Sequence, residues 1–218
     1  MLHTDAAFGN ATRQGTQAGY VIAMVHRQAA QDAQSLWSPL VWRSYRLKRV
    51  VSATLAGESQ ALGDGLGHLE WLACLWGEAL DHNFEPNKRE GTLQRTPSLA
   101  VIDCKSCYDN VMGAGDPAKD KRTAIDLVVV REALARIGTT LRWAPNPRQL
   151  ADGLTKDESR PIDLLRATLR IGTYQLFDEL SHFGNGPAGE RAKARPRPSG
   201  SSCRSSTRAA AACGQARS

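Results

Sequence analysis

The hydrophobic pattern at the start of the chain predicts three strands. Apolar residues occur in short runs separated by polar links, which is typical of strands joined in an antiparallel meander. The predicted strands are Met1–Ala7, Gly19–His26 and Leu36–Ser44. Because Pro39 lacks a backbone N–H, it predicts an edge strand or a bulge in the third of them.

The pattern then changes to the period of helices, with one buried strand among them. Apolar residues recur at helical spacing from Leu55 to Leu80, and the apolar run Leu99–Ile102 is typical of a strand buried on both faces. The polar segment Asp81–Thr96 between them predicts a loop. A short helix, an amphipathic helix, a strand and two helical segments are expected to follow, over Cys104–Met112, Lys121–Ile137, Thr139–Trp143, Arg148–Lys156 and Pro161–Arg170. The order β-β-β-α-β-α-α-β-α predicts an α/β fold.

The net charge of +6 belongs to the C-terminal end. Residues Gly184–Ser218 contain seven Lys or Arg and one acid, so the rest of the chain is neutral. This end consists mostly of Gly, Ala, Ser, Pro and Arg, which predicts a disordered basic tail. Within the neutral part, Arg46–Arg49 forms a basic cluster after the third strand. A solvated loop is a competing interpretation of that cluster.

The composition gives no sign of export or membrane insertion. No stretch approaches the roughly 20 apolar residues of a transmembrane helix, and Met1–Asn10 lacks the basic and apolar regions of a secretory signal. The five cysteines are odd in number and scattered, so they do not suggest a disulfide framework. We therefore expect a cytoplasmic or nuclear protein.

Four acidic residues lie where predicted strands or helices begin or end. Asp5 lies in or just after the first strand, and Glu58 lies in the first turn of the long helix. Asp103 directly follows the buried strand, and Asp152 begins a late helix. Because a carboxylate at the end of a buried strand is costly without a compensating charge, we expect Asp103 at the centre of a metal site.

Each acid also has an ordinary interpretation. Asp5 suits a turn, and Asp152 suits an exposed surface. Glu58 and Asp103 suit the beginning of a helix, where a carboxylate accepts hydrogen bonds from free N–H groups. Sequence spacing alone leaves these alternatives open.

Six stretches of the chain resemble, in the same order, the ribonuclease H domain at the C-terminal end of the Pol polyprotein of copia-type retrotransposons. The most specific is the last. Cys104 and Lys105 replace the Asn-Gln that this family often has, and Ala124 replaces a frequent His. The matching stretches are HTDAAFGN (His3–Asn10), AGYVIAM (Ala18–Met24), SATLAGESQAL (Ser52–Leu62), AVIDCKSCYD (Ala100–Asp109), KRTAIDLVVVRE (Lys121–Glu132) and LRWAPNPRQLADGLTK (Leu141–Lys156).

The resemblance implies an RNase H-like fold, in which a five-stranded mixed sheet with three antiparallel strands first is flanked by helices. It implies one domain over residues 1–183, best matched over 1–156, followed by the tail 184–218. It also implies a catalytic Asp-Glu-Asp-Asp site that binds metal. Residue by residue, this site carries over to Asp5, Glu58, Asp103 and Asp152.

The implied cofactors are two Mg²⁺ ions, with Mn²⁺ as an alternative. Carboxylate oxygens are the hard ligands that these ions prefer. Two ions roughly 4 Å apart activate water and stabilise the leaving 3′ oxygen of a phosphodiester.

The implied activity is endonucleolytic cleavage of the RNA strand of RNA–DNA hybrids, with recognition of RNA through its 2′-hydroxyls. A reverse transcriptase domain of the parent polyprotein is an expected partner, and no membrane is involved. The alternative is a catalytically inactive, nucleic-acid-binding remnant of such a polyprotein.

Overall fold

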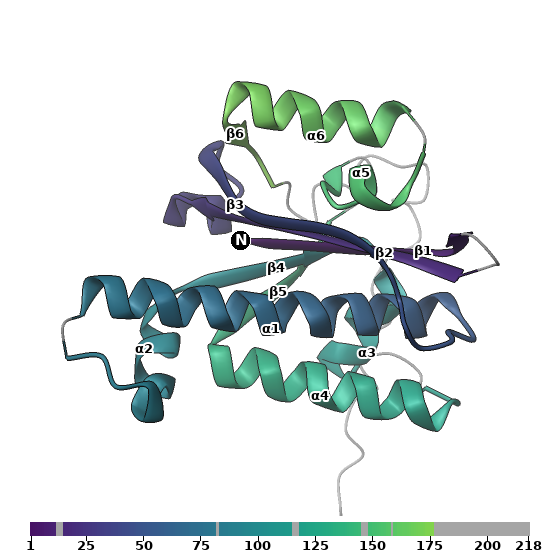
Figure 1. Cartoon of the computed structure of the whole chain (residues 1–218), viewed down its shortest axis with the longest axis horizontal. Helices are drawn as coiled ribbons and strands as arrows, with labels where there is room; N and C mark the ends of the chain where they lie inside the picture. The colour runs from purple at the N-terminus through teal and green to yellow at the C-terminus, as the bar shows by residue number, and fades with distance from the viewer. Residues whose placement is uncertain (12–14, 82, 115–117, 145–147, 158, 177–218) are drawn as a thin grey trace, which may run out of the picture. The chain divides into compact units, whose positions relative to one another are not determined.

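A mixed β-sheet forms the centre of the fold (Figure 1). The structure is a computed structural model, and it describes residues 1–11, 15–81, 83–114, 118–144, 148–157 and 159–176. The sheet of this described part has six strands in the order β5-β4-β1-β2-β3-β6. The strands are β1 (Leu2–Ala11), β2 (Gly15–Val25), β3 (Ser35–Arg46), β4 (Ser98–Ile102), β5 (Thr139–Trp143) and β6 (Thr173–Tyr174).

The pairing confirms the predicted α/β class. Strands β1, β2 and β3 form an antiparallel meander, whereas β4 and β5 pair in parallel beside β1. Five of the strands are those expected from the pattern. The sixth, β6, adds two residues beside Ser35 and Leu36 of β3, and a strand of two residues is too short to have a recognisable period. The predicted tail, 184–218, lies outside the described residues.

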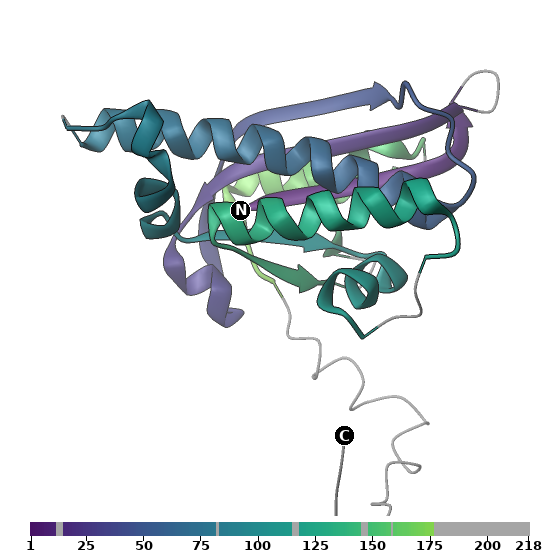
Figure 2. The ribbon, with the colours of Figure 1, turned by 90° about the horizontal axis from the view of Figure 1, so that it is seen from below.

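Helices cover both faces of the sheet (Figures 1 and 2). The helices α1, α3 and α4 lie on one face, and α5 and α6 lie on the other. Of the helices in the described residues, none is both long and apolar enough to cross a bilayer. The helices are α1 (Thr54–Leu80), α2 (Arg89–Arg95), α3 (Lys105–Met112), α4 (Lys121–Ile137), α5 (Asp152–Thr155) and α6 (Ser159–Ile171), with short 3₁₀ helices at Arg27–Gln31 and Pro86–Lys88.

Strand β4 is buried on both faces, as its continuous apolar run predicts. Ala100 and Ile102 pack into the core under α1 and α4. Leu99 and Val101 pack into the second core, which includes Trp37 and lies on the side of α5 and α6. Because β4 contributes to both cores, its C-terminal end is held firmly where Asp103 follows it.

The expectation of a bulge at Pro39 is also confirmed. The pairing of β2 with β3 shifts register between Ile22, which lies opposite Val41, and Ala23, which lies opposite Pro39. The shift leaves Leu40 as the extra residue of β3, so the missing N–H of Pro39 falls where the ladder is already irregular.

The prediction of a loop over Asp81–Thr96 is wrong. This segment contains a 3₁₀ turn and the helix α2. Its only buried side chain in the helix is Leu93, which is fully buried, and Arg89 lies 3.5 Å from Glu70 of α1. One apolar residue in seven gives no periodic signal, so the helix depends on tertiary contacts that the local pattern does not contain.

Glycines in α1 allow this helix to pack closely on β1, and they provide a matched test. A methyl group on Gly65 would lie 2.7 Å from Cγ2 of Thr4 and 3.0 Å from Cδ1 of Leu2, whereas one on Gly67 would meet open space. We expect Gly65→Ala to lower the free energy of unfolding by about 2 kcal/mol, because a β-branched strand residue must move. Gly67→Ala should raise it by about 1 kcal/mol, because alanine is the better helix former.

Urea unfolding of the two variants and the wild type measures both values. Because both changes add the same methyl group to the same helix, helix propensity is matched between them. Equal effects of the two substitutions would contradict the close approach of α1 to β1.

Candidate metal centre

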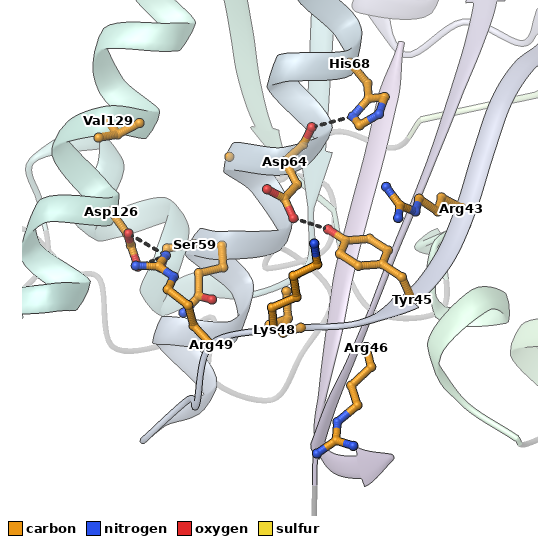
Figure 3. Close-up of a pocket in the computed structure, with 13 residues that line it drawn as sticks. Arg43, Tyr45, Arg46, Lys48, Arg49, Ser59, Asp64, His68, Asp126 and Val129 are labelled. Carbon is orange, nitrogen blue, oxygen red and sulfur yellow. Dashed lines mark hydrogen bonds and ion pairs between the residues drawn. The ribbon is translucent and has the colours of Figure 1, made fainter. Parts of the chain in front are cut away.

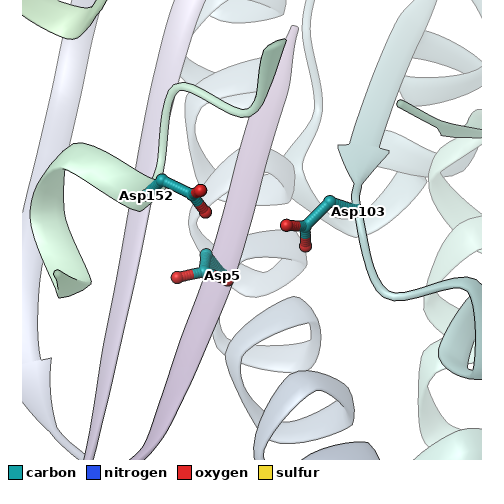
Figure 4. Close-up of side chains that lie close together, drawn as sticks. All are labelled: Asp5, Asp103 and Asp152. Carbon is teal, nitrogen blue, oxygen red and sulfur yellow. The ribbon is translucent and has the colours of Figure 1, made fainter. Parts of the chain in front are cut away.

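Three aspartates meet where strand β4 ends beside β1 (Figure 4). His3 of β1 pairs with Val101 of β4, so Asp5 and Asp103 each lie two residues further along neighbouring parallel strands. Two residues along a strand restores the same face of the sheet. Asp152, the first residue of α5, approaches from the layer that α5 and α6 form on one face of the sheet. One carboxylate oxygen from each of the three lies within 4.8 Å of the others.

Glu58 lies outside this group of three but close enough to interact with it. Its carboxylate is buried, and the backbone of Ala6, next to Asp5, favours its charged form. Burial first, and then the negative charges of Asp5 and Asp103, raise the pKa of Glu58 well above its ordinary value. The structure therefore brings three of the four predicted residues together, with Glu58 beside them.

The ordinary interpretations of the acids do not fit the structure. Asp5 is 3% exposed within β1 and Asp152 is 1% exposed, so neither is a turn or surface acid. Helix α1 begins at Thr54, which places Glu58 in the second turn and not in the first turn as predicted. Cys104, not Asp103, is the N-cap of α3, and no side-chain hydrogen bond caps that helix.

A buried glutamine holds Asp152 in place. The side-chain amide of Gln149 donates to the backbone carbonyls of Thr4 in β1 and Val101 in β4, at 3.0 and 3.3 Å. Its Oε1 accepts from the backbone N–H of Ala151 and lies 2.9 Å from Nδ1 of His3. These contacts join the segment before α5 to the two strands that carry Asp5 and Asp103.

His3 supports this arrangement in its neutral form. The ring is fully buried, and burial lowers the pKa of His3 to about 3. The neutral ring needs one N–H, and Oε1 of Gln149 can only accept, so Nδ1 is the protonated nitrogen. The hydrogen-bonded pair of Gln149 and His3 therefore adds no charge beside the carboxylates.

Replacing Gln149 by Leu is expected to lower the free energy of unfolding by about 2 kcal/mol, because two buried carbonyls lose their donor. Asp152 should also lose its fixed position, so the affinity for Mn²⁺ should fall. Urea unfolding and Mn²⁺ titration calorimetry measure the two effects. Gln34→Leu is the matched control, since the amide of Gln34 bonds the exposed hydroxyl of Thr173. Unchanged Mn²⁺ affinity in a folded Gln149→Leu variant would contradict the positioning role.

Burial and repulsion from neighbouring carboxylates favour protonation of Asp103 and Asp152. Burial, followed by the charge of Asp5, raises the pKa of Asp103 to about 6. The same two causes raise the pKa of Asp152. Because like charges are held together away from water, the cluster is electrostatically unfavourable without a cation.

Two groups on α5 and after it partly relieve this repulsion. The hydroxyl of Thr155 donates to Oδ2 of Asp5. The ammonium of Lys156 lies 2.8 Å from Oδ2 of Asp152. Although burial lowers the pKa of Lys156, its hydrogen bond to Asp152 and the charges of the other aspartates raise it overall.

The residues fit a divalent cation that prefers oxygen ligands. The donors are carboxylate oxygens on three rigidly held segments, which suits Mg²⁺ or Mn²⁺. Oδ1 of Asp152 and Oε2 of Glu58 are buried and have no hydrogen-bond partner in the described residues. Buried oxygens without a donor are rare in proteins, and a bound cation with its water would satisfy them.

Sequence analysis did not identify Gln149 or Thr155 as parts of the site. A signal existed for Thr155, because it follows Asp152 by three residues, a spacing that places two side chains on one side of a helix. Gln149 has no comparable helical spacing to Asp152, and its only signal was its place in the last of the matching stretches. It is a polar residue in a polar segment, and its burial results from the approach of β1 and β4.

Two of the solved structures to which this chain is similar contain RNase H proteins. The chain is similar to RNase H1 from the halophilic archaeon Halobacterium salinarum NRC-1, at 15% identity and a TM-score of 0.44, covering 76% of this chain and 96% of that chain. It is also similar to the N-terminal RNase H domain of rv2228c from Mycobacterium tuberculosis, determined as a fusion with maltose binding protein. That match has 16% identity and a TM-score of 0.46, covering 72% and 95% of the two chains.

No protein-family model matches the sequence, and no curated protein matches it.

Proposed function

We propose that this protein is a metal-dependent endoribonuclease that cleaves the RNA strand of RNA–DNA hybrids. The observation that carries the proposal is the meeting of Asp5, Asp103 and Asp152, three acids far apart in the sequence, with oxygens within 4.8 Å of one another. Hydrolysis of a phosphodiester at a two-metal site requires such a group of oxygen ligands.

In this proposal Asp5 and Asp103 are ligands from the sheet, and Asp152 is a ligand from α5. Glu58 completes the acidic site from the α1 side, where its free oxygen Oε2 is available. When bound, divalent ions supply activation of water and stabilisation of the charge that develops on the leaving 3′ oxygen. Thr155 orients the carboxylate of Asp5 through its hydrogen bond, and Lys156 supplies a positive charge beside Asp152.

We further propose that the chain derives from a copia-type retrotransposon Pol polyprotein. The support is the six sequence stretches that resemble that family in its order. This origin would make a reverse transcriptase domain a partner and the cytoplasm or nucleus the compartment. It also supports a domain over residues 1–183 followed by a basic tail over 184–218.

Incubation with a hybrid labelled on either strand tests the activity. We expect Mg²⁺ or Mn²⁺ to support cutting of the RNA strand within the hybrid, and EDTA to abolish it. A DNA duplex and an RNA duplex of the same sequence should stay intact, because recognition requires 2′-hydroxyls on one strand of the pair.

The alternative, a non-catalytic binding remnant, predicts a different combination of results. It would be supported by a folded protein that binds the hybrid but neither cuts it nor binds metal in the low-millimolar range. Absence of metal-dependent cleavage by the well-folded wild type would refute the nuclease proposal.

A further inference from the structure

A polar cavity separate from the carboxylate cluster lies on the side of β3 that faces α1 (Figure 3). Its volume is about 540 Å³, and it is lined by the end of β3, the first half of α1 and the facing side of α4. None of the four candidate site residues lines it. Ser59 and Gln60, which do, directly follow Glu58 in α1. The cavity and the carboxylate cluster therefore share one segment of this helix.

The charge of the cavity is positive. Four cationic side chains and two carboxylates line it, which together give a formal charge of +2. Since the chain before the tail is neutral overall, this is a local concentration of positive charge. The cations are Arg43, Arg46, Lys48 and Arg49, and the carboxylates are Asp64 and Asp126.

Internal contacts occupy some of these groups. Arg49 forms a two-pronged ion pair with Asp126, at 2.8 and 2.9 Å. The hydroxyl of Tyr45 donates to Oδ2 of Asp64 at 2.7 Å. Both carboxylates in the lining are thus engaged by groups of the cavity itself.

Two cations remain directed at the cavity. The guanidinium of Arg43 lies over the ring of Tyr45, 4.8 Å from its centroid, which fixes its position. Lys48 is exposed and has no ion pair or hydrogen bond in the part of the chain that the structure describes. Figure 3 shows it extending toward the Tyr45–Asp64 hydrogen bond, whereas Arg46 extends away from it.

We propose that this cavity binds a phosphate of the nucleic-acid backbone through Arg43 and Lys48. A guanidinium held on an aromatic ring presents its N–H groups as a fixed fork that suits phosphate oxygens, and an ammonium adds a mobile point charge. The inference rests on the proposed function, because the phosphate belongs to a strand of the proposed RNA–DNA hybrid substrate. It adds a second point of attachment, which holds the strand beside α1 while the aspartates act on another phosphate.

The test is hybrid binding without metal. Fluorescence anisotropy with a labelled RNA–DNA hybrid in EDTA, repeated across KCl concentrations, compares the wild type with Arg43→Gln/Lys48→Gln. The matched control is Arg166→Gln/Arg170→Gln, which removes two exposed charges from α6 on the other face of the sheet. Both pairs have the same net charge, so a difference between them reports position.

We expect the cavity pair to weaken binding by about tenfold and to reduce the salt slope by about 0.9, the value for one lost phosphate contact. Lys48→Gln alone, at an exposed side chain without a partner, should give about half of the change in slope. Equal affinities and slopes for the cavity pair and the control pair would overturn the proposal. Loss of the difference between the two pairs when inorganic phosphate is added at constant ionic strength would support the proposal, because free phosphate would compete with the backbone phosphate for the cavity.

The outcomes separate the two proposals. If the wild type cuts the hybrid but the two pairs bind it equally, the cavity inference fails and the proposed function stands. If the wild type does not cut but the cavity pair selectively weakens binding, the proposed function fails and the cavity is still a backbone contact.

Discussion

Replacing Asp103 by Asn is expected to lower the rate of hybrid cleavage by about a thousandfold or more, since loss of a metal ligand removes several kcal/mol of transition-state stabilisation. The substitution keeps the size and shape of the side chain but removes its negative charge. Asp103 supplies one of the three carboxylates whose oxygens lie within 4.8 Å of one another, so the variant removes one of the three proposed ligands.

The measurement is a single-turnover cleavage rate with saturating Mg²⁺ or Mn²⁺. Asp163→Asn is the matched control, because Asp163 is an exposed acid on α6 whose charge is paired with Arg166 at the surface. Its rate should equal that of the wild type. Wild-type cleavage by a folded Asp103→Asn variant would exclude Asp103 as a ligand and with it the proposed centre.

The meeting of Asp5 and Asp103 was predicted in part by the local pattern and in part by the resemblance to a known family. The run Leu99–Ile102 has the pattern of a doubly buried strand, and such strands pair in parallel in the middle of a sheet. Once β4 pairs with β1, His3 lies beside Val101, so Asp5 and Asp103, which follow them by two residues, lie close together. The pattern alone did not say which strand β4 would join, and the resemblance to ribonuclease H domains supplied that choice.

The hydrophobic periodicity of the sequence could not predict the position of Asp152. Its helix, α5, has four residues, fewer than two turns, and its placement depends on the buried amide of Gln149. A long-range hydrogen bond leaves no trace in local composition. The assignment of Asp152 therefore came from the motif QLADGLTK alone, and the structure adds the physical reason for its position.

Helix α1 begins at Thr54, one residue before the start that the apolar spacing from Leu55 predicts. Its N-cap is Ala53, which makes no side-chain hydrogen bond, so no capping side chain marks the exact start. Glu58 accordingly moved from an expected terminal position to the second turn. There it faces the sheet, where it is 4% exposed and interacts with the aspartates.

The second large effect expected is a pH-dependent loss of stability caused by Asp103 in the absence of metal. Its pKa rises from 3.8 in the unfolded chain to about 6 in the folded protein. The folded state therefore keeps a proton that the unfolded state loses between these values. Protonated Asp103 makes its full contribution to the free energy of unfolding below pH 3.8. This contribution is lost as the pH rises to about 6, which lowers the free energy of unfolding by about 3 kcal/mol.

Other buried groups change stability in the same range, and comparing the wild type with Asp103→Asn removes the contributions that the two proteins share. The lowered pKa of His3 makes the folded state more stable as the pH rises toward 6.5, which opposes the effect of Asp103. His3 is common to the wild type and to Asp103→Asn, and its contribution cancels in their difference. We expect Asp103→Asn to become more stable relative to the wild type by about 3 kcal/mol between about pH 4 and about pH 7.

Metal should reverse this difference, because carboxylates bind cations only after losing their protons. At pH 8 we expect Mn²⁺ at one hundred times its dissociation constant to stabilise the wild type by about 2.7 kcal/mol. It should have a much smaller effect at pH 5, and little at either pH on Asp103→Asn. Urea unfolding with and without Mn²⁺ at the two pH values gives all four comparisons. Stabilisation by Mn²⁺ that is equal in the variant and the wild type would mean that the ion binds elsewhere. The unfavourable charge of the metal-free cluster would then have no role in holding a cation.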